Sequence, residues 1–100
     1  MFVALLFPIF LDTTAFADFM NGNDAYERCR SRTEACAGMM MAATDMLTYF
    51  QGRKNVCMPG KVSVAQLRDV FLRHLEAQPE LRHMNFNHLF YQAMNKAFPC

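Results

Sequence analysis

The chain has 100 residues with a formal net charge of +1 at pH 7, and 53% of its residues are hydrophobic. A chain of this length forms one small domain, whose modest core leaves little margin of stability. Its basic and acidic residues are interspersed, which excludes the broad basic surface of a nucleic-acid-binding protein or a peripheral membrane protein.

The first segment is typical of an export signal. An apolar run from Phe2 to Leu11 is followed by Ala15-Phe16-Ala17, which fits the Ala-x-Ala pattern of a cleavage site. The alternatives, a membrane anchor or a first core helix, fit less well, because ten apolar residues are too few to span a bilayer and Pro8 interrupts a helix. We therefore expect residues 1–17 to be a signal peptide that is cleaved off, and residues 18–100 to be a single helical domain.

Two helices are predicted in the first half of this domain. Asn23 can cap a helix that ends near Arg30. Ser31 and Glu34 have the spacing of a capping box and predict a second helix, which ends near Gln51. Apolar residues at steps of three and four form one stripe of this second helix, which we expect to face the core. The stripe consists of Cys36, Met39, Met40, Ala43, Met46, Leu47 and Phe50.

The three consecutive methionines in this helix have two interpretations. They could form an adaptable surface for a partner. We expect instead that Met39 and Met40 fill the core while Met41 faces outward, because apolar stripes at helical spacing are usually buried. An exposed Met or Phe would instead indicate a surface that binds a partner.

Two further helices are predicted after a loop from Arg53 to Val62. Ser63 and Gln66 again have the spacing of a capping box, and Pro79 ends the third helix because the residue before a proline disfavours helical geometry. The fourth helix spans about 85–98 and has the clearest amphipathic pattern. No stretch alternates convincingly as a strand, so we predict an all-α protein, a small four-helix bundle.

The four cysteines predict a disulfide framework, which is typical of proteins in oxidising compartments, and three pairings are possible. Cys29 and Cys36 cannot pair within one straight helix, because seven residues rise about 10 Å whereas the Cα atoms of a disulfide lie within about 7 Å. A break at residues 31–33 would bring them together across a helix corner, and Cys57 would then pair with Cys100. We expect this pairing rather than Cys29–Cys57 with Cys36–Cys100.

Catalytic, metal and cofactor motifs are not recognised in the sequence. His74, His83 and His88 could each partner a cysteine nucleophile, but disulfide formation would remove the thiolate. The spacings of the cysteines and of the histidines differ from the close ligand pairs of zinc sites. No phosphate-binding, haem-attachment or calcium-binding pattern is found. We therefore expect no enzymatic activity, no metal and no cofactor.

Several spaced elements occur together between residues 22 and 100. The most specific are Pro79-Glu80-x-Arg82-His83 and Ala97-Phe98-Pro99-Cys100. They are preceded by Cys36-x-Gly38, Asp45, Cys57-x-Pro59 and Gln66-Leu67-x-Asp69-Val70. This combination resembles the Rap/Tai immunity proteins of type VI secretion. The chain departs from that family in its second helix, where Gly38-Met39-Met40-Met41-Ala42 replaces Gly-Tyr-Ile-x-Gly, and at Phe86 in the fourth.

The resemblance implies a small helical protein of the periplasm that is not an enzyme. Members of the family bind and block peptidoglycan amidases, which are cysteine-histidine peptidases injected by other cells, and they commonly act as homodimers. We therefore expect a cell-wall amidase as the partner, with no nucleic acid and, for the mature form, no membrane. The alternative is a periplasmic chaperone or adaptor with the same fold and no toxin partner, which the abundance of Met and Phe suggests.

Two loops are candidates for contact with the toxin, since a protruding loop fills a cleft better than a flat helix face. The loop that Cys57 anchors carries Arg53, Lys54 and Lys61. The loop between Gln78 and Asn85 carries Glu80, Arg82 and His83. Arg82 and His83 have an alternative interpretation, in which they only form bonds at the ends of helices.

Overall fold

The computed structural model describes residues 19–51 and 54–100. These ranges contain four α-helices and one short 3-10 helix, and no strand longer than an isolated bridge. The elements are α1 (Gly22–Arg30), α2 (Glu34–Gln51), α3 (Val64–Ala77), η2 (Pro79–Leu81) and α4 (Phe86–Ala97). The predicted all-α fold is confirmed, whereas the leader expected at residues 1–17 lies outside the described residues. None of the helices described has both the length and the apolar character needed to cross a membrane.

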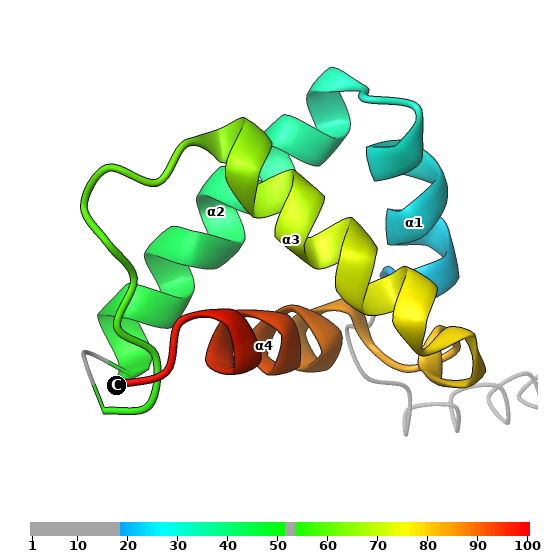
Figure 1. The fold of residues 1–100 in the computed structure, drawn as a ribbon. Helices are drawn as coiled ribbons and strands as arrows, with labels where there is room; N and C mark the ends of the chain where they lie inside the picture. The colour runs from blue at the N-terminus through cyan, green and yellow to red at the C-terminus, as the bar shows by residue number, and fades with distance from the viewer. Residues whose placement is uncertain (1–18, 52–53) are drawn as a thin grey trace, which may run out of the picture.

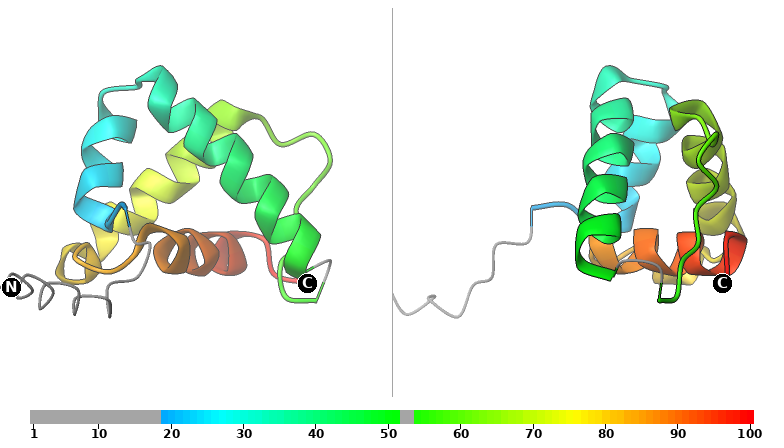
Figure 2. Two further views of the ribbon diagram at one scale, coloured as in Figure 1. Left: turned by 180° about the vertical axis from the view of Figure 1, so that it is seen from behind. Right: turned by 90° about the vertical axis from the view of Figure 1, so that its left-hand side faces the viewer.

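Helix α3 is the central element of the fold, because it contacts α1, α2 and α4. Helices α2 and α3 lie close together at one end and diverge toward the other, while α4 runs across the open side between them (Figure 1). The view from behind shows the same arrangement, and the side view shows α2 and α3 on opposite sides of the molecule with α4 across one end (Figure 2).

Aromatic rings from α3 and α4 form the centre of the core. The ring of Phe71 is fully buried, and its centroid lies 5.5 Å from that of Phe86 and 6.0 Å from that of Phe90. Aromatic pairs at such separations add to the stability that burial alone supplies. Around them lie the largest fully buried side chains of the other positions, namely Met40, Leu75, Leu89, Met94, Cys29 and Cys36.

The apolar stripe of α2 faces the core only in its first part. Met40 is fully buried and Met39 packs against the core, whereas Met41 is 50% exposed, as we expected for these three residues. The expectation is wrong for Met46 and Phe50, which are 53% and 69% exposed. Because α2 and α3 diverge toward this end of α2, α3 does not cover it (Figure 1).

The starts of α1 and α2 differ from the prediction. Asn21, rather than Asn23, caps α1: its side chain accepts a bond of 2.9 Å from the Asp24 amide, and the Asp24 carboxylate accepts one from the Asn21 amide. The capping box predicted for Ser31 is also wrong, because the Ser31 amide still donates to Glu27 in the last turn of α1. Each cap lies where the backbone amides at the true helix start need an acceptor.

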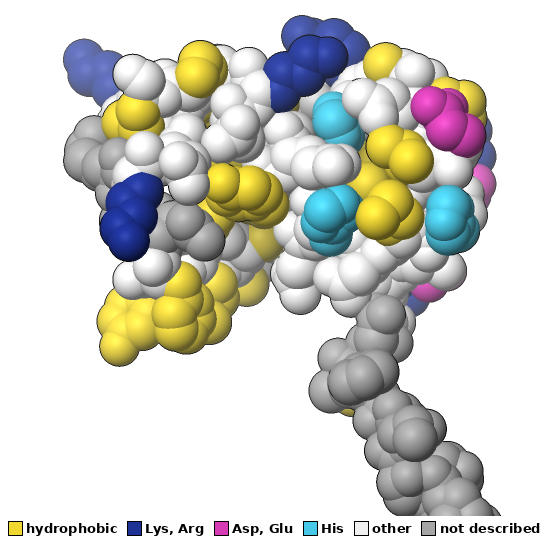
Figure 3. Space-filling view, turned by 90° about the horizontal axis from the view of Figure 1, so that it is seen from below, with side chains coloured by type: hydrophobic (Ala, Val, Ile, Leu, Met, Phe, Trp, Pro, Cys, Tyr) yellow, Lys and Arg dark blue, Asp and Glu magenta, His cyan; other side chains and the backbone are white. Residues whose placement is uncertain are grey.

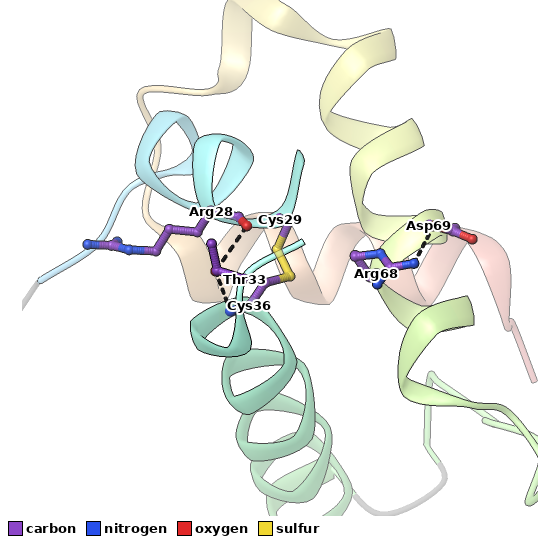
Figure 4. Close-up of a disulfide and its surroundings, with 6 residues drawn as sticks. All are labelled: Arg28, Cys29, Thr33, Cys36, Arg68 and Asp69. Carbon is purple, nitrogen blue, oxygen red and sulfur yellow. Dashed lines mark hydrogen bonds and ion pairs between the residues drawn. A yellow bond between two sulfur atoms is a disulfide. The ribbon is translucent and has the colours of Figure 1, made fainter. Parts of the chain in front are cut away.

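A short corner joins α1 to α2, and Thr33 holds it together. Its hydroxyl donates to the Arg28 carbonyl over 3.1 Å and accepts from the Cys36 amide over 3.2 Å (Figure 4). Arg32 has a φ of 57°, which reverses the chain direction within the corner. The corner therefore sets the angle at which α2 leaves α1.

Both disulfides have the expected pairing. Cys29 and Cys36 are joined across the corner with a Cα separation of 4.9 Å (Figure 4), and Cys57 is joined to Cys100 with a separation of 5.0 Å. Beside the second disulfide the Cys57 amide donates to the Phe98 carbonyl over 2.9 Å. The carboxyl-terminal tail is thus bound to the loop between α2 and α3.

Replacing Cys57 and Cys100 together by serine should lower the free energy of unfolding. The bridge has a sequence separation of 43 residues, and the chain-entropy model assigns a loop of that size about 4 kcal/mol. Urea denaturation followed by circular dichroism measures the loss. A loss below about 1 kcal/mol would show that the bridge constrains the unfolded chain far less than this loop length implies.

Candidate functional site

The two candidate loops lie at opposite ends of the molecule (Figures 1 and 2). The loop before α3 carries Lys54 and Lys61, and both side chains are exposed. Arg53 lies outside the described residues. At the other end Glu80, Arg82 and His83 follow one another in the segment that leads from α3 into α4. The structure therefore divides the predicted contact residues into two separate groups.

Consecutive turns give the segment between α3 and α4 a defined backbone. Pro79 occupies the first position of η2. A backbone amide at this position would have no partner within the helix, so the lack of one in proline costs no hydrogen bond. The Leu81 amide donates to the Gln78 carbonyl over 3.0 Å, and the Met84 amide donates to the Leu81 carbonyl over 3.0 Å. Asn85 then caps α4, since its side chain accepts from the Asn87 amide over 2.8 Å.

The first turn of α1 binds this segment. The Gly22 amide donates to the Met84 carbonyl over 2.9 Å, and the Asn23 amide donates to the Arg82 carbonyl over 2.8 Å. Amides in the first turn of a helix have no partner within the helix. The loop carbonyls satisfy two of them here, so the start of α1 and the loop stabilise each other.

Gly22 allows this close approach because it has no side chain. A Cβ atom at this position would collide with the side chain of Leu89 and would lie 2.7 Å from the carbonyl oxygen of Arg82. Gly38 in α2 contrasts with it, since nothing lies within 4 Å of a Cβ atom built there. The contact between α1 and the loop therefore requires glycine at position 22.

Arg82 packs against α1 instead of extending into solvent. Its guanidinium carbon lies 4.1 Å from the ring centroid of Tyr26, a separation that gives a favourable cation–π contact. The Tyr26 hydroxyl also donates to Glu76 in α3 over 3.5 Å. The side chain of Arg82 thus links the loop to α1 by stacking, and its carbonyl accepts the bond from the Asn23 amide at the start of the helix, as the alternative interpretation expected.

Glu80 and His83 remain as the exposed ionisable side chains of this loop. They lie on either side of Arg82 on a backbone that the contacts with α1 hold in place. A carboxylate accepts hydrogen bonds and an imidazole can donate or accept them. The loop can therefore offer two polar groups in fixed positions to a partner.

A second feature is a shallow cleft between α3 and α4 with a volume of about 240 Å³. Burial lowers the pKa of His74 in this cleft from 6.5, the neighbouring Gln92 side chain opposes this effect, and the charge of Lys96 lowers the pKa further. The histidines gather on the face of the molecule seen from below, beside a small apolar area (Figure 3).

Among the described residues, no three His, Cys, Asp or Glu side chains lie close enough to hold a metal ion.

All four cysteines are bonded in disulfides, so none provides a thiolate nucleophile. Near the end of α2, Tyr49 and Phe50 are 79% and 69% exposed, and no pattern in the sequence predicts this exposure. Phe50 has the helical spacing of buried residues, whereas Tyr49 lies outside the apolar stripe of α2.

Substituting Gly22 by alanine should destabilise the protein by about 1–3 kcal/mol, because the added methyl group forces the loop away from α1. Gly38→Ala is the matched control, and it should stabilise the protein by about 0.5–1 kcal/mol, since the site is open and helical. Urea denaturation of both variants checks the pair. Equal stability of Gly22→Ala and the unmodified protein would contradict the contact described here.

The lowered pKa of His74 should make stability depend on pH. Between the folded pKa and 6.5 the unfolded chain binds more protons, so the free energy of unfolding falls as the pH drops through this window. His74→Gln should show a smaller fall when urea denaturation is repeated from about pH 7.5 to about pH 5.5. An identical pH dependence in the two proteins would contradict the role given to His74.

Comparison with known proteins gives one finding. The family of Rap1a immunity proteins matches residues 21–100, a range that includes all four cysteines and both candidate loops. Neither the curated proteins nor the solved structures gave a significant match. Because the match covers most of the chain and the four α-helices of the described residues, this protein belongs to the Rap1a immunity protein family.

Proposed function

We propose that this protein is a periplasmic immunity protein that binds and blocks a cell-wall amidase delivered by type VI secretion. The observation that carries the proposal is the match of residues 21–100 to the Rap1a immunity proteins, which supports a toxin as the binding partner. The protein acts by occupying the toxin and catalyses no reaction itself. Its four cysteines are all in disulfides, which suits an oxidising compartment.

The segment from Gln78 to Asn85 enters the catalytic cleft of the amidase. An inhibitor gains affinity when its contact loop is ordered before binding, because less conformational entropy is lost in the complex. Hydrogen bonds of 2.8 and 2.9 Å to the start of α1, together with the stacking of Arg82 on Tyr26, supply this order. Glu80 and His83 then contact polar groups of the cleft.

The loop with Lys54 and Lys61 is the second candidate for contact, and Arg53 belongs to the same group. Val56, at 5% exposure, and the disulfide of Cys57 anchor this loop. Its lysines suit an acidic surface on the toxin. Because it lies at the other end of the molecule, one toxin cleft cannot receive both loops from the same copy (Figure 1).

A chaperone or adaptor without a toxin partner is the other candidate function, and the exposed side chains of Tyr49 and Phe50 favour it. Such a protein would suppress the aggregation of unrelated periplasmic clients. If the purified protein instead leaves client aggregation unchanged, this candidate is removed.

Inhibition of an amidase encoded beside this gene tests the main proposal. The purified protein should stop the enzyme from cleaving the peptide stems of peptidoglycan. Glu80→Ala and His83→Ala should each weaken the complex at least about tenfold, which is about 1.4 kcal/mol. Calorimetric titration of the toxin with each variant gives this ratio.

Lys54→Ala and Lys61→Ala are the matched controls, since they remove exposed charges from the other loop and should change the affinity less than about twofold. If Lys54→Ala and Lys61→Ala weakened the complex more than Glu80→Ala and His83→Ala, the toxin contact would lie in the loop before α3. The inhibitory function would still stand in that case. An unmodified protein that neither binds nor inhibits the neighbouring amidase would contradict the function itself.

A further inference from the structure

The two disulfides differ in how far the fold covers them. Cys29 and Cys36 are both 0% exposed and belong to the buried core. In contrast, Cys57 is half-buried and Cys100 is exposed. In the side view the carboxyl terminus lies on the side of the molecule away from α2, so that helix does not cover it (Figure 2). One bridge is therefore closed to solvent, whereas the other is accessible.

We propose that the disulfide between Cys57 and Cys100 is a site of thiol–disulfide exchange with a dithiol reductant. Exchange opens this bridge in the folded protein and leaves the bridge between Cys29 and Cys36 closed. The reaction begins when a thiolate attacks a disulfide sulfur, so its rate depends on access to that sulfur. At the buried bridge a thiolate reaches the sulfur atoms only after the core has opened. The proposal does not depend on which toxin the protein binds.

The exchange has two steps. A thiolate of the reductant attacks the Sγ atom of Cys100, the more exposed of the two residues, forms a mixed disulfide with it and releases Cys57 as a thiolate. The second thiolate of the reductant then attacks the reductant's own sulfur in the mixed disulfide and releases Cys100. The reductant leaves as a disulfide, having given two electrons to the protein, and the two cysteine thiolates take up the two protons that it lost.

Opening this bridge affects one end of the molecule. The segments that it joins keep two further contacts, since the Cys57 amide donates to the Phe98 carbonyl over 2.9 Å and Val56 pairs with Pro99 in an isolated antiparallel bridge. The aromatic centre of the core lies in α3 and α4, outside these segments. We therefore expect the reduced protein to keep its helices, while the tail separates more readily from the loop before α3.

The two candidate contact loops respond differently to this reduction. The loop before α3 carries the exposed residues Lys54 and Lys61, and it loses its covalent link to the tail. The segment from Gln78 to Asn85 keeps its structure, because its bonds to the first turn of α1 involve neither cysteine of the accessible bridge. The accessible bridge thus makes one end of the molecule sensitive to reduction and leaves the other end insensitive.

Reduction of the folded protein followed by alkylation tests the proposal. The protein is treated with dithiothreitol, samples are alkylated with iodoacetamide over time, and mass spectrometry of the peptides reports the modification of each cysteine. Cys57 and Cys100 should be modified at least about 100-fold faster than Cys29 and Cys36, because only their bridge is accessible. The same treatment in urea is the control, since unfolding exposes both bridges and the two rates should then differ less than about tenfold.

A variant that combines Cys57→Ser with Cys100→Ser imitates the opened bridge. Cys29 and Cys36 should stay protected from dithiothreitol in this variant, because the core that buries them remains folded. Amide hydrogen exchange at position 57 should be faster than in the unmodified protein, since the tail then separates more readily. The exchange of the Gly22 amide, which bonds to the other loop, should not change.

Three outcomes would overturn the proposal. Equal rates for the two pairs in the folded protein, or faster modification of Cys29 and Cys36, would show that burial does not protect the inner bridge. Loss of both bridges together would show that the outer bridge cannot open without unfolding the chain. An unchanged rate ratio in urea would assign the selectivity to the local sequence instead of the fold. Because no toxin is present in these experiments, the proposed inhibitory function keeps its own test.

Discussion

The contact between the first turn of α1 and the segment from Arg82 to Met84 is the constraint on which the candidate site depends. The first amides of a helix have no hydrogen-bond partner within the helix, and these loop carbonyls have none within the loop, so the two sets bond to each other. Gly22 permits the approach, and the stacking of Arg82 on Tyr26 reinforces it. A loop held in this way keeps one conformation while Glu80 remains accessible to a partner.

The two disulfides extend the same principle to the rest of a small chain. The bridge at the corner between α1 and α2 fixes the helix whose first turn supports the loop, and the second bridge binds the tail to the opposite loop. A modest core alone gives a domain of this size little stability. The bridges thus let a helical scaffold hold an ordered loop without a large hydrophobic interior.

The helix pattern could be predicted from the sequence because its signals are local, as the cap at Ser63 shows. The start of α1 could not, since Asn21 and Asn23 have the same capping ability and the choice depends on bonds to a distant loop. Phe50 has the spacing of a buried residue, but its exposure depends on where α2 and α3 diverge. The loop of the candidate site was identified from its sequence, whereas the stacking of Arg82 on Tyr26 joins residues that no sequence pattern connects.

Amide hydrogen exchange of Gly22 and Asn23 in the free protein tests most directly whether the loop is ordered before it binds. Amides at the start of a helix ordinarily exchange quickly because they lack partners within the helix. If the loop carbonyls hold them as described, both should exchange as slowly as amides in the middle of α3. Exchange of both at the rate of exposed amides would show that the loop leaves α1 readily, and would contradict a preformed inhibitory surface.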